Sequence, residues 1–193
     1  MSLSEQLTNK KNSLKPTDTI ITLTNGRRYL ERKGNLNREL EEKSYGFIVD
    51  TKPDNIPAKI TKNIYLGSQD CCELNTLQEC NIQHVLSIGI EAPCKYPNID
   101  YKYIKCLDFP EVDIITLITN ECIPFINDVV KNDQNLLVHC NAGVSRSSSV
   151  VLAYLILVCN MSYDDAYNLV KSKRNCIRPN DGFEKQLKLL IKS

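Results

Sequence analysis

The chain has 193 residues, of which 42% are hydrophobic, and its formal net charge at pH 7 is +1. This length suits one domain with an appendage, and the balanced charge gives no sign of a nucleic-acid partner. Residues 3–7 are too short and polar a run for a signal peptide, and the longest apolar run, residues 150–159, is below the roughly 18 residues of a membrane span. We therefore expect a cytoplasmic protein with no membrane partner, with the nucleus as the alternative location.

Nine cysteines and two histidines are present. An odd number of cysteines at irregular spacing, without a secretory signal, is typical of reduced thiols that pack as small hydrophobic side chains. Only His84 and His139 offer imidazole ligands, and the adjacent Cys71 and Cys72 have no second close cysteine pair. We expect no structural zinc site and no metal or other cofactor.

Residues 1–56 form a polar, charged extension. Asn25-Gly26 lies between β-prone runs in "TIITLTNGRRYLE", which predicts a hairpin. A lone two-stranded hairpin is marginally stable in water, so it either docks on another surface or stays mobile, and both alternatives remain open. Solvated surface charge explains a basic cluster in the same segment, with a docking site for an acidic partner as the alternative. The cluster comprises Arg27, Arg28, Arg32 and Lys33.

Residues 57–193 carry the dense hydrophobic pattern of a folded domain. Within them, "AKITKNIYLGS" predicts two short strands joined by a turn. Three further strands are predicted in "IQHVLSIGI", "YKYIKCLDF" and "NLLVHC". Asp70 is placed to cap a short helix over residues 71–80. Strands that alternate with helices indicate an α/β fold with a largely parallel sheet.

The segment 113–130 carries a helical stripe with a proline inside it. The stripe consists of Ile114, Ile118, Cys122, Phe125 and Val129. Because Pro124 removes a helix hydrogen bond and clashes with the preceding turn, we expect a break or kink there and regular helix only from about Asn120.

Three more helices are expected after residue 140. The first begins near Arg146. The second has Ser162 with Asp165 three residues later, and the third has Asp181 with Glu184, which are box-like N-terminal caps.

The stretch "LVHCNAGVSRSSS" combines an aliphatic strand, a cysteine, a loop of mostly small residues and an arginine at a helix start. Such a loop can curl so that its N–H groups point inward, and the helix adds free N–H groups and the positive end of its dipole. Together they make a cradle suited to phosphate, and the arginine can donate two parallel hydrogen bonds to the same anion. The predicted phosphate-binding loop comprises Cys140, Asn141, Ala142, Gly143, Val144, Ser145 and Arg146.

Cys140 lies within this positive field, which favours the thiolate form of a cysteine. The pattern predicts that its sulfur attacks phosphorus and forms a phosphocysteine that water later splits. Ser147 can donate its hydroxyl to the sulfur as it leaves. His139 precedes the nucleophile, and we expect it to fix the loop geometry rather than to transfer a proton.

The sequence "HCNAGVSRSS" resembles the signature loop of the cysteine-based protein tyrosine phosphatase superfamily, in particular its dual-specificity branch, HC-x-x-G-x-S-R-S. The resemblance runs from Ala58 to Leu190, includes "NIYLGSQD", "CLDFPEVDI" and "RPNDGF", and is to the small atypical members of the branch. It implies a central five-stranded, mostly parallel mixed sheet flanked by helices. It also implies metal-free hydrolysis of phosphotyrosine and phosphoserine or phosphothreonine in proteins.

A leaving oxygen needs a proton, and a carboxylic acid near the pocket is the natural donor. Asp108 follows a predicted strand, in a loop stiffened by Pro110. The resemblance places the general acid in this loop and points to Asp108, with Glu111 and Asp113 as alternatives. Helix capping explains Asn180 in "RPNDGF", and support of the active-site loop is its second expected role.

Two classes of function remain for comparison. An active protein phosphatase is favoured because Cys140, Arg146 and Asp108 are all present, and a phosphoprotein-binding scaffold on the same fold is the alternative. A lipid phosphatase is a further alternative, but such enzymes often place lysines inside the loop and "NAGVS" has none. The resemblance implies phosphorylated proteins as partners, with MAP-kinase pathway components among them, and the sequence does not predict an oligomeric state.

Overall fold

The computed structural model describes residues 18–22, 28–32, 35–40 and 54–190. The chain divides into two compact units, Met1–Tyr45 and Gly46–Ser193, which are considered separately. No helix in the described ranges is both long enough and apolar enough to cross a membrane.

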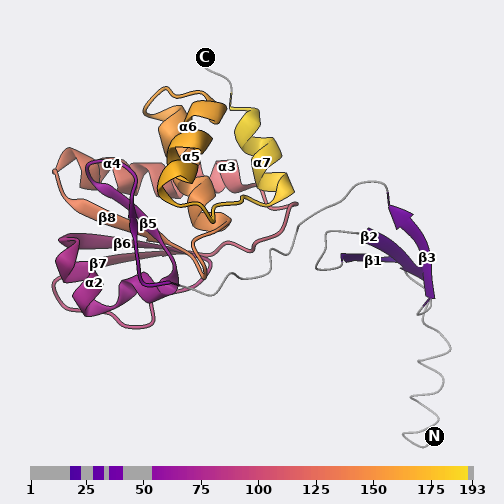
Figure 1. Cartoon of the computed structure of the whole chain (residues 1–193), viewed down its shortest axis with the longest axis horizontal. Coiled ribbons are helices and arrows are strands. Elements are labelled where there is room, and N and C mark those ends of the chain that lie inside the picture. Colours follow the sequence, from indigo (N-terminus) through magenta and orange to yellow (C-terminus); the bar gives the residue numbers. More distant parts are fainter. Residues whose placement is uncertain (1–17, 23–27, 33–34, 41–53, 191–193) are drawn as a thin grey trace, which may run out of the picture. The chain divides into compact units, whose positions relative to one another are not determined.

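The first unit contains a three-stranded antiparallel sheet (Figure 1). Its strands are β1 (Asp18–Thr22), β2 (Arg28–Arg32) and β3 (Asn35–Leu40). β1 and β2 pair in antiparallel register, while the Asn25-Gly26 turn predicted between them lies outside the described residues. The sequence did not predict β3, because "NLNREL" is polar and has no β-branched residue.

The second unit is built on a five-stranded sheet with the order β4-β5-β8-β6-β7. The strands are β4 (Ala58–Lys59), β5 (Ile64–Gly67), β6 (Ile82–Ile88), β7 (Asp100–Ile104) and β8 (Asn135–His139). β4 pairs antiparallel with β5, and the other neighbours pair in parallel. The predicted mixed, mostly parallel sheet of five strands is therefore confirmed.

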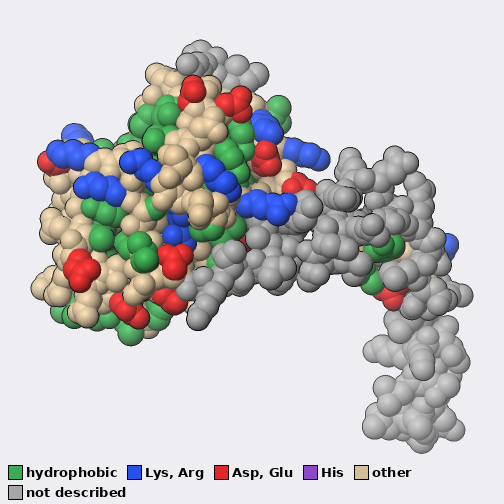
Figure 2. Space-filling view, viewed as in Figure 1, with side chains coloured by type: hydrophobic (Ala, Val, Ile, Leu, Met, Phe, Trp, Pro, Cys, Tyr) green, Lys and Arg blue, Asp and Glu red, His purple; other side chains and the backbone are tan. Residues whose placement is uncertain are grey.

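Helices cover both faces of this sheet (Figure 1). Alternate residues of β8 point to opposite faces. Leu136 and Val138 join the larger hydrophobic cluster with α5, whereas Leu137 joins the smaller one with Leu77 of α2. The helical segments are η1 (Gln69–Cys72), α2 (Leu74–Glu79), α3 (Ile114–Leu117), η2 (Ile118–Cys122), α4 (Ile123–Lys131), α5 (Arg146–Leu157), α6 (Tyr163–Lys173) and α7 (Asp181–Lys188). The space-filling view shows acidic and basic side chains interspersed on the visible face (Figure 2).

One predicted helix cap is wrong by two residues, and two others are present in the structure. Ser68, rather than Asp70, accepts the first free N–H at 3.0 Å, and the segment divides into a 3₁₀ turn and α2 instead of one helix. The expected capping role of Asn180 is confirmed, because its side-chain oxygen accepts the N–H of Phe183 at 2.9 Å, whereas Asp181 of the box-like signal lies in the first turn of α7. The predicted cap of α6 by Ser162 is present.

The expectation for residues 113–130 is also corrected. Helix begins at Ile114, where the Asp113 carboxylate accepts the N–H of Thr116, and continues to Lys131 without a break. A π-helical turn, η2, lies just before Pro124, and the Ile123 N–H donates to the Ile118 carbonyl. This wider turn takes up the irregularity that proline imposes, because Pro124 then falls in the first turn of α4, where its missing N–H costs little.

Candidate active site

The loop between β8 and α5 holds Cys140 at the carboxyl end of the central strand. Residues 136–139 of β8 are fully buried, so the strand is fixed from both faces. Cys140 follows with 2% of its surface exposed. α5 begins at Arg146 and is buried from Ser147 to Ile156. The loop is therefore held between two buried elements.

Successive backbone carbonyls of this loop accept hydrogen bonds from its surroundings. They belong to Asn141, Ala142, Gly143 and Val144. The donors are the backbone N–H groups of Gln69 and Arg178 and the guanidinium of Arg174, at 2.9–3.0 Å. In a trans peptide unit the N–H points opposite to the C=O, so the N–H groups between these carbonyls face the inside of the loop. With the N-terminus of α5, they form a cradle for a tetrahedral oxyanion.

Cys140 and Ser147 are in direct contact. The Ser147 hydroxyl donates a hydrogen bond to Cys140 Sγ over 3.2 Å, and Ser147 is fully buried. A hydrogen bond of this kind stabilises negative charge on sulfur. Elsewhere in the domain, burial raises the pKa of the Cys106 thiol to about 11 and that of the Cys122 thiol to about 12, so these thiols stay protonated at neutral pH.

His139 is a buried neutral imidazole that braces the loop. Burial lowers its pKa to about 4. Its Nδ1 lies 3.2 Å from the Cys140 carbonyl oxygen, which can only accept, so Nδ1 carries the hydrogen. Its Nε2 then accepts from the Ser87 hydroxyl at 2.7 Å. This arrangement ties β6 to the start of the loop and leaves the ring no free nitrogen for proton transfer.

Arg146 points its guanidinium toward the end of β6. Its Nε lies 3.5 Å from Asp108 Oδ2 and, among the described residues, is a buried donor with no hydrogen-bond partner. Gly89, with φ of +74°, makes the space, since a Cβ there would lie 2.3 Å from Nη1 of Arg146. The sequence showed that the strand ends in glycine but not that an arginine packs against it.

Asp108 is fixed by the loop and by α7. Its Oδ1 accepts from the Ser145 hydroxyl at 2.7 Å and from the Asn180 side-chain amide at 2.8 Å. Ser145 Oγ in turn accepts the backbone N–H of Asn180 at 3.0 Å, so its hydrogen is directed to Asp108. Oδ1 therefore accepts two hydrogen bonds, and Oδ2 is the carboxylate oxygen that lies nearer Arg146.

The alternative carboxylates face elsewhere. Asp113 caps α3, and its hydrogen bond from Thr116 lowers the pKa of its carboxyl group. Glu111 and Asp113 both line a separate surface pocket of about 360 Å³, shared with Gln186 of α7. Within the part of the chain that the structure describes, no group of three or more His, Cys, Asp or Glu side chains could hold a metal ion.

Helix α7 and its cap, Asn180, form a platform for the Asp108 loop, which the sequence did not reveal. Gln186 donates from Nε2 to the Val112 carbonyl and accepts the Ile114 N–H at Oε1. Gly182 approaches Pro110 so closely that a Cβ on the glycine would lie 2.0 Å from the Pro110 carbonyl oxygen. Asn180 therefore both caps α7 and holds Asp108, and only its capping role and a general supporting role were predicted from its position.

Comparisons with known proteins agree with this geometry. Residues 64–192 match the family model described as dual specificity phosphatase, catalytic domain. A probable dual specificity protein phosphatase of Dictyostelium discoideum is 31% identical over 97% of this chain and 96% of its own length. Dual specificity protein phosphatase 1 of Arabidopsis thaliana is 34% identical over 74% of this chain and 72% of its own.

Solved structures are similar as well. The crystal structure of DUSP15 is 36% identical, with a TM-score of 0.65, and the match covers 70% of this chain and 86% of that one. The human tyrosine phosphatase-like serine/threonine/tyrosine-interacting protein is 30% identical, with a TM-score of 0.63, over 68% of this chain and 93% of that one. Since the family model spans more than half of the chain and the first relative matches along nearly its whole length, this chain belongs to the dual-specificity protein phosphatases.

Proposed function

We propose that this phosphatase hydrolyses phosphotyrosine and phosphoserine or phosphothreonine in proteins through a phosphocysteine intermediate. The observation that carries the proposal is the position of Cys140 Sγ, which accepts a hydrogen bond from Ser147 at the start of a loop whose carbonyls point outward. A thiolate there faces inward N–H donors that can hold three phosphate oxygens while sulfur attacks phosphorus.

In the first step the Cys140 thiolate forms an S–P bond, and the P–O bond to the substrate side chain breaks. Arg146 and the loop N–H groups stabilise the equatorial oxygens as charge accumulates on them. The departing oxygen takes the proton from Asp108. The dephosphorylated side chain leaves as an alcohol or phenol, and Asp108 is left as a carboxylate.

In the second step water attacks phosphorus and the S–P bond breaks. The Asp108 carboxylate takes a proton from the attacking water, which restores the acid. The Ser147 hydroxyl, already 3.2 Å from Cys140 Sγ, stabilises the thiolate that departs. The products are inorganic phosphate and the enzyme in its starting state.

The proposed substrates are phosphorylated proteins, including components of MAP-kinase pathways, and the proposed location is the cytoplasm. The proposal for the substrates rests on the resemblance to the atypical dual-specificity branch. Within that branch, the sequence motifs "LGSQD" and "VHCNAGVSR" support a particular similarity to dual-specificity phosphatase nineteen.

A phosphoprotein-binding scaffold is the second candidate, and the similarity to the human tyrosine phosphatase-like interacting protein favours considering it. A scaffold needs the cradle but neither nucleophile nor acid. In this chain Cys140, Ser147, Arg146 and Asp108 lie together, which supports turnover. A lipid phosphatase is less well supported, because the loop "NAGVS" has no lysine for a multiply charged headgroup.

The test compares wild type with Cys140→Ser in the presence of a reductant. Wild type should hydrolyse an aryl phosphate and phosphopeptides that carry either phosphotyrosine or phosphothreonine. Cys140→Ser should lose essentially all turnover but retain phosphoproteins, and mass spectrometry of the retained proteins would identify substrates. Turnover by the variant above a few per cent of wild type would exclude the covalent mechanism, and an inactive wild type that still binds phosphopeptides would support the scaffold.

A further inference from the structure

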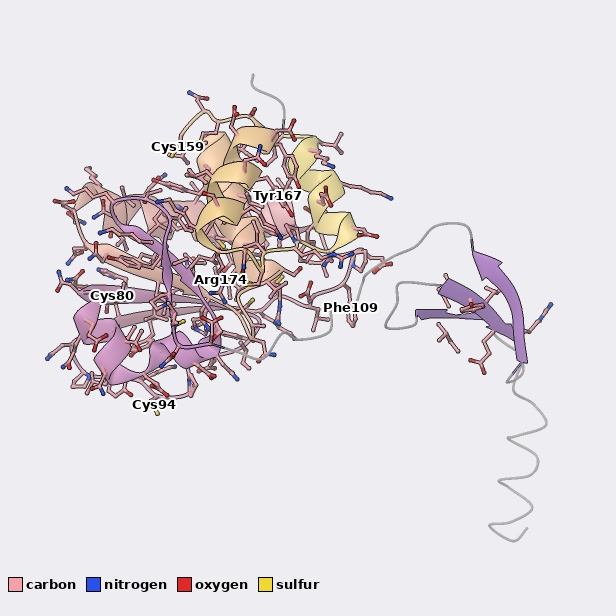
Figure 3. The ribbon with its side chains drawn as sticks, viewed as in Figure 1. Cys80, Cys94, Phe109, Cys159, Tyr167 and Arg174 are labelled. Atoms are coloured by element: carbon pink, nitrogen blue, oxygen red, sulfur yellow. The ribbon has the colours of Figure 1, made fainter. Side chains whose placement is uncertain are left out.

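Arg174 is a buried arginine whose five N–H donors are all used. It directly follows α6 as its C-terminal cap residue, is 6% exposed, and lies in the interior of the second unit (Figure 3). Nε donates to the Gly143 carbonyl at 3.0 Å and Nη2 to the Ala142 carbonyl at 2.9 Å. The remaining donors contact the Asp54 carboxylate, at 2.9 and 3.3 Å, and the Ile56 carbonyl, at 3.4 Å.

The two loop carbonyls that Arg174 holds determine where two loop N–H groups point. When the Ala142 carbonyl faces Arg174, the N–H of Gly143 in the same peptide unit faces the opposite way, into the loop. The Gly143 carbonyl fixes the N–H of Val144 in the same manner. These two donors belong to the middle of the cradle, where an oxyanion would lie.

Asp54 completes the arrangement from the opposite side. Its two carboxylate oxygens contact Nη1 and Nη2 of Arg174 in a bidentate pair, and Oδ1 also accepts the Ile56 N–H at 3.1 Å. Its backbone carbonyl accepts from the Ser68 hydroxyl at 2.6 Å and from Cys71 Sγ at 3.3 Å. Asp54 is thus anchored beside η1 and neutralises a buried cation that is not itself in the oxyanion site.

We propose that Arg174 and Asp54 are a positioning pair that sets the oxyanion affinity of the Cys140 loop by fixing the direction of the Gly143 and Val144 N–H groups. The proposal rests on the proposed function, in which that loop binds phosphate. A lysine cannot replace Arg174, because one ammonium carries three donors on a single nitrogen and cannot span two loop carbonyls and a carboxylate. The bidentate contact with Asp54 fixes the orientation of the planar guanidinium and so keeps both carbonyls aligned.

The experiment measures tungstate binding to the full-length protein by calorimetry, with reductant, well below the melting temperature of each variant. Tungstate is a tetrahedral dianion that needs no catalytic step. We expect Arg174→Lys and Arg174→Ala to weaken tungstate binding by about tenfold or more, since hydrogen bonds to a charged group are among the strongest in proteins. Asp54→Asn, a change at a side chain that is 42% exposed and so is expected to fold, should weaken it by about threefold to tenfold. Lys173→Ala removes a positive charge from the exposed preceding residue and should leave the affinity unchanged.

Two further readouts separate positioning from a general loss of structure. If Asp54 acts through Arg174, the double variant Asp54→Asn/Arg174→Ala should bind tungstate no more weakly than Arg174→Ala alone. With an aryl phosphate, Asp54→Asn should raise KM and lower kcat but leave the alkaline limb of the pH profile in place, because Asp108 keeps its contacts.

The possible outcomes distinguish this proposal from the proposed function. Wild-type affinity in both Asp54→Asn and Arg174→Lys would overturn the positioning role while leaving the phosphatase mechanism intact. Additive losses in the double variant would likewise overturn the coupling through Arg174. No tungstate binding by wild type would instead overturn the phosphate-binding role of the loop.

Discussion

Arg146 supplies geometry as well as charge to the active-site loop. Its guanidinium can donate two parallel hydrogen bonds to an oxyanion, whereas a lysine ammonium cannot match that spacing. We therefore expect Arg146→Lys to lower kcat/KM for an aryl phosphate by at least about 100-fold, the size typical of a lost transition-state donor. Steady-state kinetics checks this, and a lysine variant near the wild-type rate would show that positive charge alone suffices.

Asp108 is held by hydrogen bonds from Ser145 and Asn180. Asp108→Asn should lower turnover of phosphoserine or phosphothreonine peptides by about 100-fold or more, because an alkoxide leaves poorly without a proton. The loss should be much smaller for a nitrophenyl phosphate, whose leaving group needs little help. The variant should also lose the alkaline limb of the turnover–pH profile, since activity in wild type falls as the acid gives up its proton at higher pH.

The matched controls are Glu111→Gln and Asp113→Asn, which change the two carboxylates that face the pocket beside α7. Both should keep the alkaline limb. If Glu111→Gln flattens that limb while Asp108→Asn does not, the acid is Glu111.

At the scale of residues, the sequence identified those members of the candidate site that lie close together in the chain. Cys140, Arg146 and Ser147 share one short motif, so a strand, a loop and a helix start were enough to predict the contact of Cys140 with Ser147 and the place of Arg146 at the start of the helix. Arg174 and Gln186 reach the site only through tertiary packing. "KSKR" has the composition of an exposed, basic helix end, and nothing in its local pattern distinguishes the buried arginine from the exposed Lys173 beside it.

At the scale of elements, α7 positions the acid loop from across the fold. Gly182→Ala would place a Cβ in steric collision with the Pro110 backbone, so the loop carrying Asp108 must move. We expect the variant to lower kcat for phosphopeptides by about tenfold or more, and to lower it less for nitrophenyl phosphate, because only the acid is displaced. Tungstate affinity should stay near that of wild type.

Lys185→Ala, on the exposed side of the same helix, is the control and should have no such effect. Equal losses for good and poor leaving groups in Gly182→Ala would contradict the role of α7 as a platform for the acid.

Element boundaries show where local patterns fail. The stripe from Ile114 to Val129 predicted a helix correctly. The rule that proline disrupts helices predicted a break or kink at Pro124, whereas the structure has a π-helical turn just before it. A π turn satisfies the backbone around Pro124 and keeps Ile118 and Cys122 in the core, where both are fully buried. The proline is therefore accommodated in the first turn of α4 while the apolar stripe stays buried.

For the whole molecule, composition and alternation predicted an α/β fold with a largely parallel sheet, and the family resemblance supplied the five mixed strands. The strand order β4-β5-β8-β6-β7 places the last strand in the chain at the centre. Hydrophobic pattern alone does not give that order, because β5, β6 and β8 are all buried runs that would fit a central position. The central place of β8 is what brings Cys140 between the loops that follow β5 and β6.

His139 couples the stability of the whole domain to pH. Burial lowers its pKa to about 4 in the folded state, compared with 6.5 for a free imidazole, so the unfolded chain binds the extra proton between these values. The free energy of unfolding should therefore fall as pH decreases from about 6.5 toward 4, by up to about 1.4 kcal/mol per pH unit from this residue.

His139→Asn, which does not titrate, should be less stable at pH 7 because it leaves a gap beside Ser87, but should show a shallower dependence on pH in that window. Urea unfolding under reducing conditions at several pH values measures both quantities, and His84→Gln, which removes the only other histidine, is the control. Equal pH slopes for wild type and His139→Asn would mean that the buried imidazole is not the group that titrates.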